Sequence, residues 1–356
     1  MNIRGERRTC AAELLARGAV AVVALIALAT IVRGLGPVAY AAFALVYAAV
    51  AISGAALLHH FVAGRDARLE PISLRWTPVL HLFGAPLALT TFSLALLRWA
   101  DRFVLAGYVD TANLGIYAAA VDLAQWVFVV VIGSLYHVWL PRLTVDLHDT
   151  DPRIRTDTAS RYALLLIALL LPALTGLALL RIDIVETLFG SEYAAQAALL
   201  PWVVLAVALG LLRTFVLDVG LYIVGRAGAV TRNVLVSAVI GFILNVLCVP
   251  RYGVSAAIAA SLVTQSIALA LAWFSGRDVI NWRIPRMHFE RILFSCGLMV
   301  LPLLLMPHGG LLAFGARASV AVAVYGVAML LVNGVDCRTW LLAGLRRRTG
   351  GGGVAP

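Results

Sequence analysis

Long uncharged apolar runs alternate with short arginine-bearing connections along most of this chain. The runs predict ten membrane-spanning helices, at residues 11–32, 38–60, 78–99, 113–140, 161–181, 194–216, 230–249, 253–275, 288–306 and 311–333. Most of them reach the roughly 18–20 residues that an α-helix needs to cross a hydrocarbon core of about 30 Å. Because lipid cannot hydrogen-bond the backbone, repeated spans of this length predict an all-α fold, a polytopic transmembrane helix bundle.

Composition agrees with this pattern. The chain is 62% hydrophobic and 13% charged, whereas a soluble domain is about 25% charged. All 28 basic residues are arginines, and they lie between the apolar runs rather than on one nucleic-acid-binding surface. The four cysteines, Cys10, Cys248, Cys296 and Cys337, lack metal-ligand or disulfide spacing. We therefore expect the lipid bilayer as environment, with no metal, no cofactor and no nucleic-acid partner.

Arginine is distributed unevenly between the two sides that ten spans would define. The two tails and every second connection hold 21 arginines, and the opposite connections hold five, Arg33, Arg98, Arg102, Arg181 and Arg251. Arginine and lysine accumulate on the cytoplasmic side of membrane proteins. We therefore expect a multi-pass protein of the cytoplasmic (inner) membrane with both termini in the cytoplasm.

The segment 101–143 carries several short motifs in a fixed order. They are the Asp101-Arg102 pair, Gly107-Tyr108, "LGIYAAA" at 114–120 and "LPRL" at 140–143. In this the segment resembles a helical hairpin of the lipid-linked oligosaccharide flippases. These are the O-antigen and exopolysaccharide exporters of the multidrug/oligosaccharidyl-lipid/polysaccharide superfamily.

The resemblance implies a MATE-like architecture, in which two inverted six-helix lobes flank a central cavity. Residues 1–77 would form a partial first lobe of two spans, and residues 78–276 a second six-helix lobe. Residues 277–356 would add two C-terminal spans and a basic, glycine-rich cytoplasmic tail. The first lobe would then be incomplete, lacking about four helices.

The resemblance also implies a function without covalent chemistry, and so no catalytic residues. The protein would flip a lipid-linked oligosaccharide across the membrane, with other polysaccharide-assembly membrane proteins as further partners. Two alternatives stay open: a non-transporting scaffold of such an assembly, and an integral-membrane glycosyltransferase or ligase. An enzyme would need a large outer loop. The outer connections are short, and Asp183, Glu186 and Glu192 form their only acidic cluster.

Arg98, Asp101 and Arg102 share one face near the outer end of the third predicted span. The two guanidiniums would suit a diphosphate or an acidic sugar, because their planar forks match such oxyanions. Alternatively, Asp101 pairs with Arg98 on the same helix while Arg102 extends outward to the membrane interface.

Asp122 and Gln125 lie one turn apart on the fourth span, too deep for a short carboxylate to reach water. Ionisable groups at such depth usually face a cavity or a partner. We favour a cavity-lining carboxylate that could couple transport to an ion. The other interpretation makes Asp122 the partner of an arginine on a neighbouring helix.

Arg213 and Asp218 lie toward the cytoplasmic end of the sixth span. Five residues separate them by about 140° around an α-helix, so both cannot face one cavity. A substrate role and an ion pair with a neighbouring helix therefore stay open for Asp218. Arg317, near the outer end of the tenth span, is expected to extend to the interface. The stripe Asn233, Ser237, Gly241 and Asn245 favours helix–helix packing over a binding site.

Overall fold

The computed structural model describes residues 85–149, 151–190, 197–280, 282–307 and 309–336. This part of the chain is helical and contains no β-strand, which confirms the all-α prediction. The elements are α3 (Ala85–Ala106), α4 (Thr111–Asp146), α5 (Pro152–Leu179), α6 (Arg181–Ile184), the π-helix η4 (Val185–Phe189), α7 (Leu200–Leu212), the π-helix η6 (Arg213–Asp218), α8 (Val219–Ile223), α9 (Ala227–Gly276), α10 (Arg286–Leu305), α11 (Gly310–Leu331) and the 3₁₀ turn η7 (Gly334–Asp336). The predicted spans 11–32 and 38–60 lie outside the described residues.

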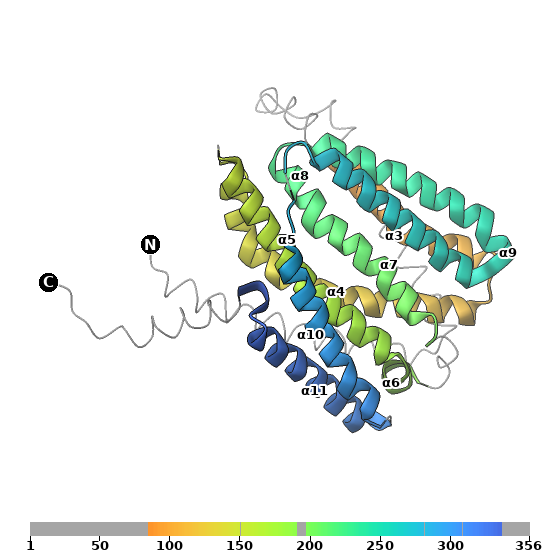
Figure 1. Ribbon diagram of the computed structural model, residues 1–356. Coiled ribbons are helices and arrows are strands. Elements are labelled where there is room, and N and C mark those ends of the chain that lie inside the picture. Colours follow the sequence, from red (N-terminus) through yellow and green to blue (C-terminus); the bar gives the residue numbers. More distant parts are fainter. Residues whose placement is uncertain (1–84, 150, 191–196, 281, 308, 337–356) are drawn as a thin grey trace, which may run out of the picture.

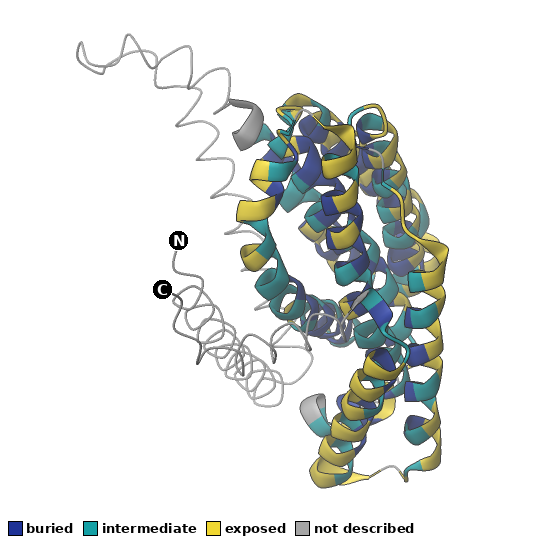
Figure 2. Ribbon diagram, turned by 60° about the vertical axis from the view of Figure 1, so that its left-hand side comes forward, coloured by how far each residue is buried: buried dark blue, intermediate teal, exposed yellow. Residues whose placement is uncertain are grey.

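Six of the described helices are long and apolar enough to cross a membrane. They are α4, α5, the continuous stretch Leu200–Ile223, α9, α10 and α11. Helix α9 is 50 residues long and covers two predicted spans. Figure 2 shows exposed residues along the outer faces of the helices, and many of them are large and apolar, as Phe242, Leu247 and Leu305 are. Such faces suit lipid, so the chain is a multi-pass membrane protein.

Helix α9 folds back on itself at Gly253. There the backbone adopts φ 58° and ψ −137°, shortly after Pro250 in the same helix. The two arms lie side by side (Figure 1), and Asn233 of the first donates to the Ser275 hydroxyl of the second at 2.9 Å. A Cβ on Gly241 would lie only 2.9 Å from Cγ2 of Thr264. The predicted role of this small and polar stripe in helix packing is thus confirmed.

Gly253→Ala is expected to destabilise the protein by about 1–3 kcal/mol, because a side chain at this φ and ψ is strained. The nearest atom to a new Cβ would be Val109 Cγ2 at 3.7 Å, so the cost comes from the backbone rather than from a clash. Gly297→Ala in α10 is the control, since a Cβ there meets nothing within 4 Å. Thermal unfolding of the purified proteins gives the unfolding temperature of both variants and of the wild type. Equal unfolding temperatures for Gly253→Ala and the wild type would contradict a strained turn.

The other helices pack around this hairpin. Helix α3 lies along α9, and α7 contacts α9, α4 and α5. Helices α10 and α11 form a second hairpin that packs against α5 (Figure 1). In the described residues, five segments able to cross a membrane precede this last hairpin, if the two arms of α9 are counted separately, and α3 precedes these five.

Asp110 fixes the connection between α3 and α4. Its carboxylate accepts hydrogen bonds from the side-chain amide of Asn113 at 2.6 Å and from the Asn113 backbone N–H at 3.1 Å. The amide of Asn113, followed by this backbone N–H, holds the pKa of Asp110 below its ordinary value. Asp110 is thus the N-cap of α4, and it sets where the fourth span begins.

Candidate functional site

Arg102 joins α3 to α4 through Asp122. Its Nη2 donates to Oδ1 of Asp122 at 2.5 Å, and its Nη1 lies 3.4 Å from Oδ2. The guanidinium also stacks on the Trp99 ring, 4.5 Å from the ring centroid. The side chain of Arg102 is 2% exposed and that of Asp122 is 17% exposed. Arg102 therefore does not extend to the membrane interface, and that expectation is wrong.

The same contact decides between the two interpretations of Asp122. The carboxylate is the partner of an arginine on the neighbouring helix, the interpretation that the sequence favoured less. It is not fully enclosed, however, and Gln125 one turn further along α4 is also partly exposed. Access of solvent or a ligand to this part of α4 stays a prediction.

Asp101 has a partner that the sequence analysis missed. Its carboxylate accepts hydrogen bonds from the Tyr117 hydroxyl of α4 and from the Arg102 backbone N–H. Arg98 is not its partner, so the expected pair between Asp101 and Arg98 is wrong. Tyr117 lies in the "LGIYAAA" motif, and its phenol, which needs a hydrogen-bond partner when buried, was the available signal.

Arg98 remains exposed on the same helix. Its guanidinium carbon lies 5.5 Å from the centroid of the Trp99 ring, which also contacts Arg102. The three charged residues Arg98, Asp101 and Arg102 therefore have different environments in this structure. Asp101 and Arg102 are buried and bonded to α4, whereas the side chain of Arg98 is exposed at the surface of the helix bundle.

The charges do not mark the end of α3, as the predicted span ending at residue 99 implies. The helix continues to Ala106. Asp101 accepts a hydrogen bond from α4 and Arg102 donates to α4 inside the bundle, so these residues need not lie beyond the end of the helix.

Arg213 and Asp218 form a buried ion pair within one helix. The Nε of Arg213 lies 3.2 Å from Oδ2 of Asp218, and both side chains are almost fully enclosed. The chain from Arg213 to Asp218 is a π-helix, in which hydrogen bonds run from residue i to i+5. Residues five apart then share a face, so the separation expected for an α-helix does not apply. The expected ion pair with a neighbouring helix is wrong.

This pair is incompletely bonded. Nη1 of Arg213 and Oδ1 of Asp218 are buried, and neither has a hydrogen-bond partner in the part of the chain that the structure describes. Buried polar atoms without partners are uncommon, and π-helical turns recur at functional sites. The η6 segment therefore stays a candidate for a part of the protein that rearranges or receives a ligand.

Arg317 and Asp183 form a third buried pair, which the sequence analysis did not predict. Arg317 of α11 donates to the Asp183 carboxylate of α6 and to the Leu303 carbonyl oxygen of α10. The side chain of Arg317 is 1% exposed, so the expectation that it extends to the interface is wrong. The available signal was an isolated arginine in an apolar span, on the same predicted side as an aspartate.

The described residues contain no group of three or more His, Cys, Asp or Glu side chains that could hold a metal ion. Arg102, Arg213 and Arg317 form ion pairs with carboxylates between helices or within one, and Asp101 accepts hydrogen bonds from Tyr117 and the Arg102 backbone. A guanidinium such as that of the exposed Arg98 can bind an anion. The fold and these paired charges define a multi-pass helical membrane protein with charged groups inside its bundle.

The chain belongs to the family of polysaccharide biosynthesis proteins, which matches residues 7–198, more than half of its length. Its fold is similar to that of the lipid II flippase MurJ in the inward closed conformation, with a TM-score of 0.60 and 14% sequence identity. The similarity covers 76% of this chain and 58% of the flippase, so the chain spans less than two thirds of that protein. No curated protein sequence matches it. The expected link to polysaccharide biosynthesis is confirmed by the family, and the expected fold by its likeness to a lipid flippase.

Proposed function

We propose that this protein flips a lipid-linked oligosaccharide from the inner to the outer leaflet of the cytoplasmic membrane. The observation that carries the proposal is the fold, similar to that of a lipid II flippase over 76% of the chain, in a member of a polysaccharide biosynthesis family. A flippase changes no covalent bond. It must instead offer the polar head group a path across about 30 Å of hydrocarbon.

The proposed architecture has about ten spans, with both termini in the cytoplasm. The excess of arginine in alternate connections supports this orientation. Residues 78–276 would form a six-helix lobe of MATE-like topology, comprising α3 to α9. Residues 1–77 would belong to a first lobe, and residues 277–356 would add the α10–α11 hairpin and the tail. Opposed lobes could then rock around a central site.

Within this architecture Arg98 would contact the anionic head group. It is exposed, it lies on the proposed outer half of α3, and a guanidinium matches the oxygens of a diphosphate or an acidic sugar. Arg102 would hold α3 and α4 together through Asp122. Asp122 and Gln125 would line the path, with Asp122 as the carboxylate that could couple transport to an ion.

The test reconstitutes the whole chain in vesicles that contain a fluorescent isoprenoid-diphosphate oligosaccharide in both leaflets. A membrane-impermeant quencher then reports how much of the lipid reaches the outer leaflet. The wild type is expected to expose the inner pool with time. Arg98→Ala should slow this at least tenfold, since hydrogen bonds to charged groups contribute about 1.5–3 kcal/mol. Arg98→Lys should restore only part of the rate, because lysine lacks the planar fork.

Arg142→Ala is the matched control, since Arg142 is also an exposed arginine that lies over a tryptophan ring, that of Trp139. It should flip at the wild-type rate. An inner pool that stays protected with the wild type would contradict the flippase proposal and favour a scaffold. Full activity of Arg98→Ala would contradict only the role of Arg98.

A further inference from the structure

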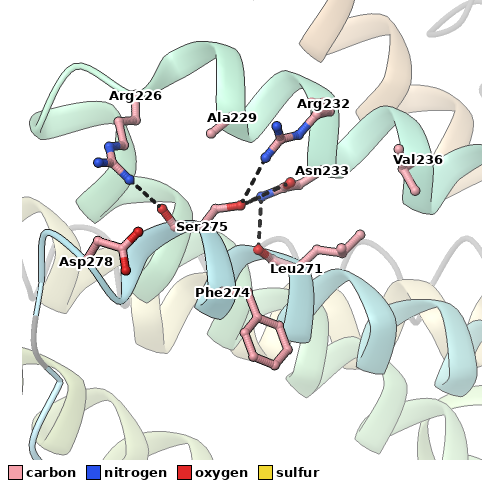
Figure 3. Close-up of a pocket in the computed structure, with 9 residues that line it drawn as sticks. All are labelled: Arg226, Ala229, Arg232, Asn233, Val236, Leu271, Phe274, Ser275 and Asp278. Carbon is pink, nitrogen blue, oxygen red and sulfur yellow. Dashed lines mark hydrogen bonds between the residues drawn. The ribbon is translucent and has the colours of Figure 1, made fainter.

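A pocket of about 540 Å³ lies at the open end of the α9 hairpin, where its first and last turns meet (Figure 3). This end is next to the beginning of α3, because the Thr90 and Thr231 hydroxyls are 2.6 Å apart. Arg102 is about 18 Å further along α3, at a rise of 1.5 Å per residue. The pocket is therefore distinct from the cluster around Arg102 and Asp122.

Two guanidiniums converge on one residue of the opposite arm. Nη1 of Arg226 donates to the Ser275 carbonyl oxygen at 3.0 Å, and Nη2 of Arg232 lies 3.5 Å from the Ser275 hydroxyl (Figure 3). The amide of Asn233, whose side chain is buried in the pocket wall, donates to the same hydroxyl at 2.9 Å and to the Leu271 carbonyl at 3.3 Å. Ser275 is thus held in place between the two arginines.

The charge of the pocket is positive. Arg226 and Arg232 are both exposed, and neither forms an ion pair with any carboxylate of the described residues. Asp278 also lines the pocket, but its carboxylate pairs with the guanidinium of Arg277 at 3.8 Å. The first turn of α9, to which Ala229 belongs, adds the partial positive charge of a helix N-terminus without a side-chain cap. An anion would therefore be attracted to the space between the two guanidiniums.

The side of the pocket further from the hairpin ends is apolar. Val236, which is 40% exposed, and Leu271 lie one turn further from the hairpin ends than Arg232 and Ser275 do. Phe274, which is 59% exposed and next to Ser275, also lines the pocket. The pocket thus offers guanidiniums at the hairpin end and an apolar wall along the spanning part of the helices. A lipid with a phosphate head group has this distribution of polar and apolar parts.

We propose that this pocket binds the phosphate head group of an anionic membrane lipid. The phosphate lies between Arg226 and Arg232, and the first part of an acyl chain lies along Val236, Leu271 and Phe274. Basic pockets between transmembrane helices on the cytoplasmic side bind such head groups, and the proposed orientation places this end of α9 there. The site goes beyond the proposed function, because it lies apart from the residues assigned to the oligosaccharide path.

Native mass spectrometry of the detergent-purified full chain tests this proposal by titration with phosphatidylglycerol and, separately, with phosphatidylcholine. The wild type should bind a first phosphatidylglycerol at least tenfold more tightly than Arg226→Gln/Arg232→Gln does. Phosphatidylcholine should bind both proteins equally. The control Arg153→Gln/Arg161→Gln removes two exposed arginines from the same proposed side of the membrane and should bind as the wild type does.

Ala229→Glu is a second variant, and it places a carboxylate in the pocket. An acidic residue in the first turn of a helix is compatible with folding, and the variant should lose the tight phosphatidylglycerol site. Unchanged phosphatidylglycerol binding in the double arginine variant or in Ala229→Glu would overturn the proposal. Inorganic phosphate that binds the wild type and excludes phosphatidylglycerol at equal concentration would overturn the lipid assignment in favour of a free phosphate site. None of these outcomes depends on flipping activity.

Discussion

Arg102→Ala is expected to destabilise the protein by about 3–5 kcal/mol, the usual effect of removing one partner of a buried ion pair. The substitution leaves the Asp122 carboxylate without its guanidinium at a position that is only 17% exposed. It also removes the cation that stacks on Trp99. Thermal unfolding of the purified protein and its abundance in membranes should both fall. Under the proposed function, flipping by the remaining folded protein should fall as well.

Two further variants test whether the loss of stability comes from the unpaired Asp122 carboxylate or from the removal of any arginine on this part of α3. Arg98 lies one turn away on the same helix and is exposed. Its replacement in Arg98→Ala should therefore leave the unfolding temperature unchanged. Arg102→Ala/Asp122→Asn leaves no unpaired carboxylate at this position, so it should recover most of the lost stability. Wild-type stability of the single variant would contradict the structural role of the pair. Full recovery of flipping in the double variant would contradict the proposed coupling role of Asp122.

Arg317→Ala is expected to have an effect of similar size, about 3–5 kcal/mol, because Asp183 would lose its buried partner. The substitution also removes the donor to the Leu303 carbonyl, so α11 loses its bonds to α6 and to α10. We expect a lower unfolding temperature and faster proteolysis of the protein, as α11 is held less firmly against α6 and α10.

Arg181→Ala is the control for this experiment. Arg181 belongs to the same short helix as Asp183, but it is exposed. It should leave both readouts unchanged, and Asp183→Asn/Arg317→Gln should recover part of the stability by removing both charges. Proteolysis of Arg317→Ala at the wild-type rate would contradict the role of this pair in holding the hairpin.

The apolar runs predicted which parts of the described chain form long helices, but not all of their bounds, since α5 begins at Pro152 rather than at residue 161. The hairpin turn of α9 follows from Pro250 and Gly253, and the beginning of α10 lies within two residues of its prediction. Run length works here because an uncharged segment of about 20 residues has few other stable places in a membrane protein. The end of α3 was harder to predict, because its charges are bonded to α4 rather than placed at the helix end.

The partners of the charged residues could not be predicted from sequence. Hydropathy gives the cost of placing a charge in lipid, but not which side chain offsets that cost. Arg102 and Asp122 are brought together by the packing of two helices, and Arg317 and Asp183 by the docking of a separate hairpin. The sequence indicated that each buried charge needs a partner or a cavity. The packing of the helices determines which of the two it has, and which side chain is the partner.

The π-helix from Arg213 to Asp218 also makes this segment the place where the span can change in length. A π-turn holds one residue more than the α-turn it replaces, so the flanking α7 and α8 keep their faces despite the extra residue. Removal of one residue between the charges would leave them four apart, a spacing that still forms an ion pair in an α-helix. Removal of a residue elsewhere in Leu200–Ile223 would instead rotate one flank against the other by about 100°. Gly220 would then turn away from Ile280, against which it now fits so closely that a Cβ would lie 2.8 Å from Cδ1. We therefore expect this span to tolerate the insertion or removal of a residue best in the segment between its two charges.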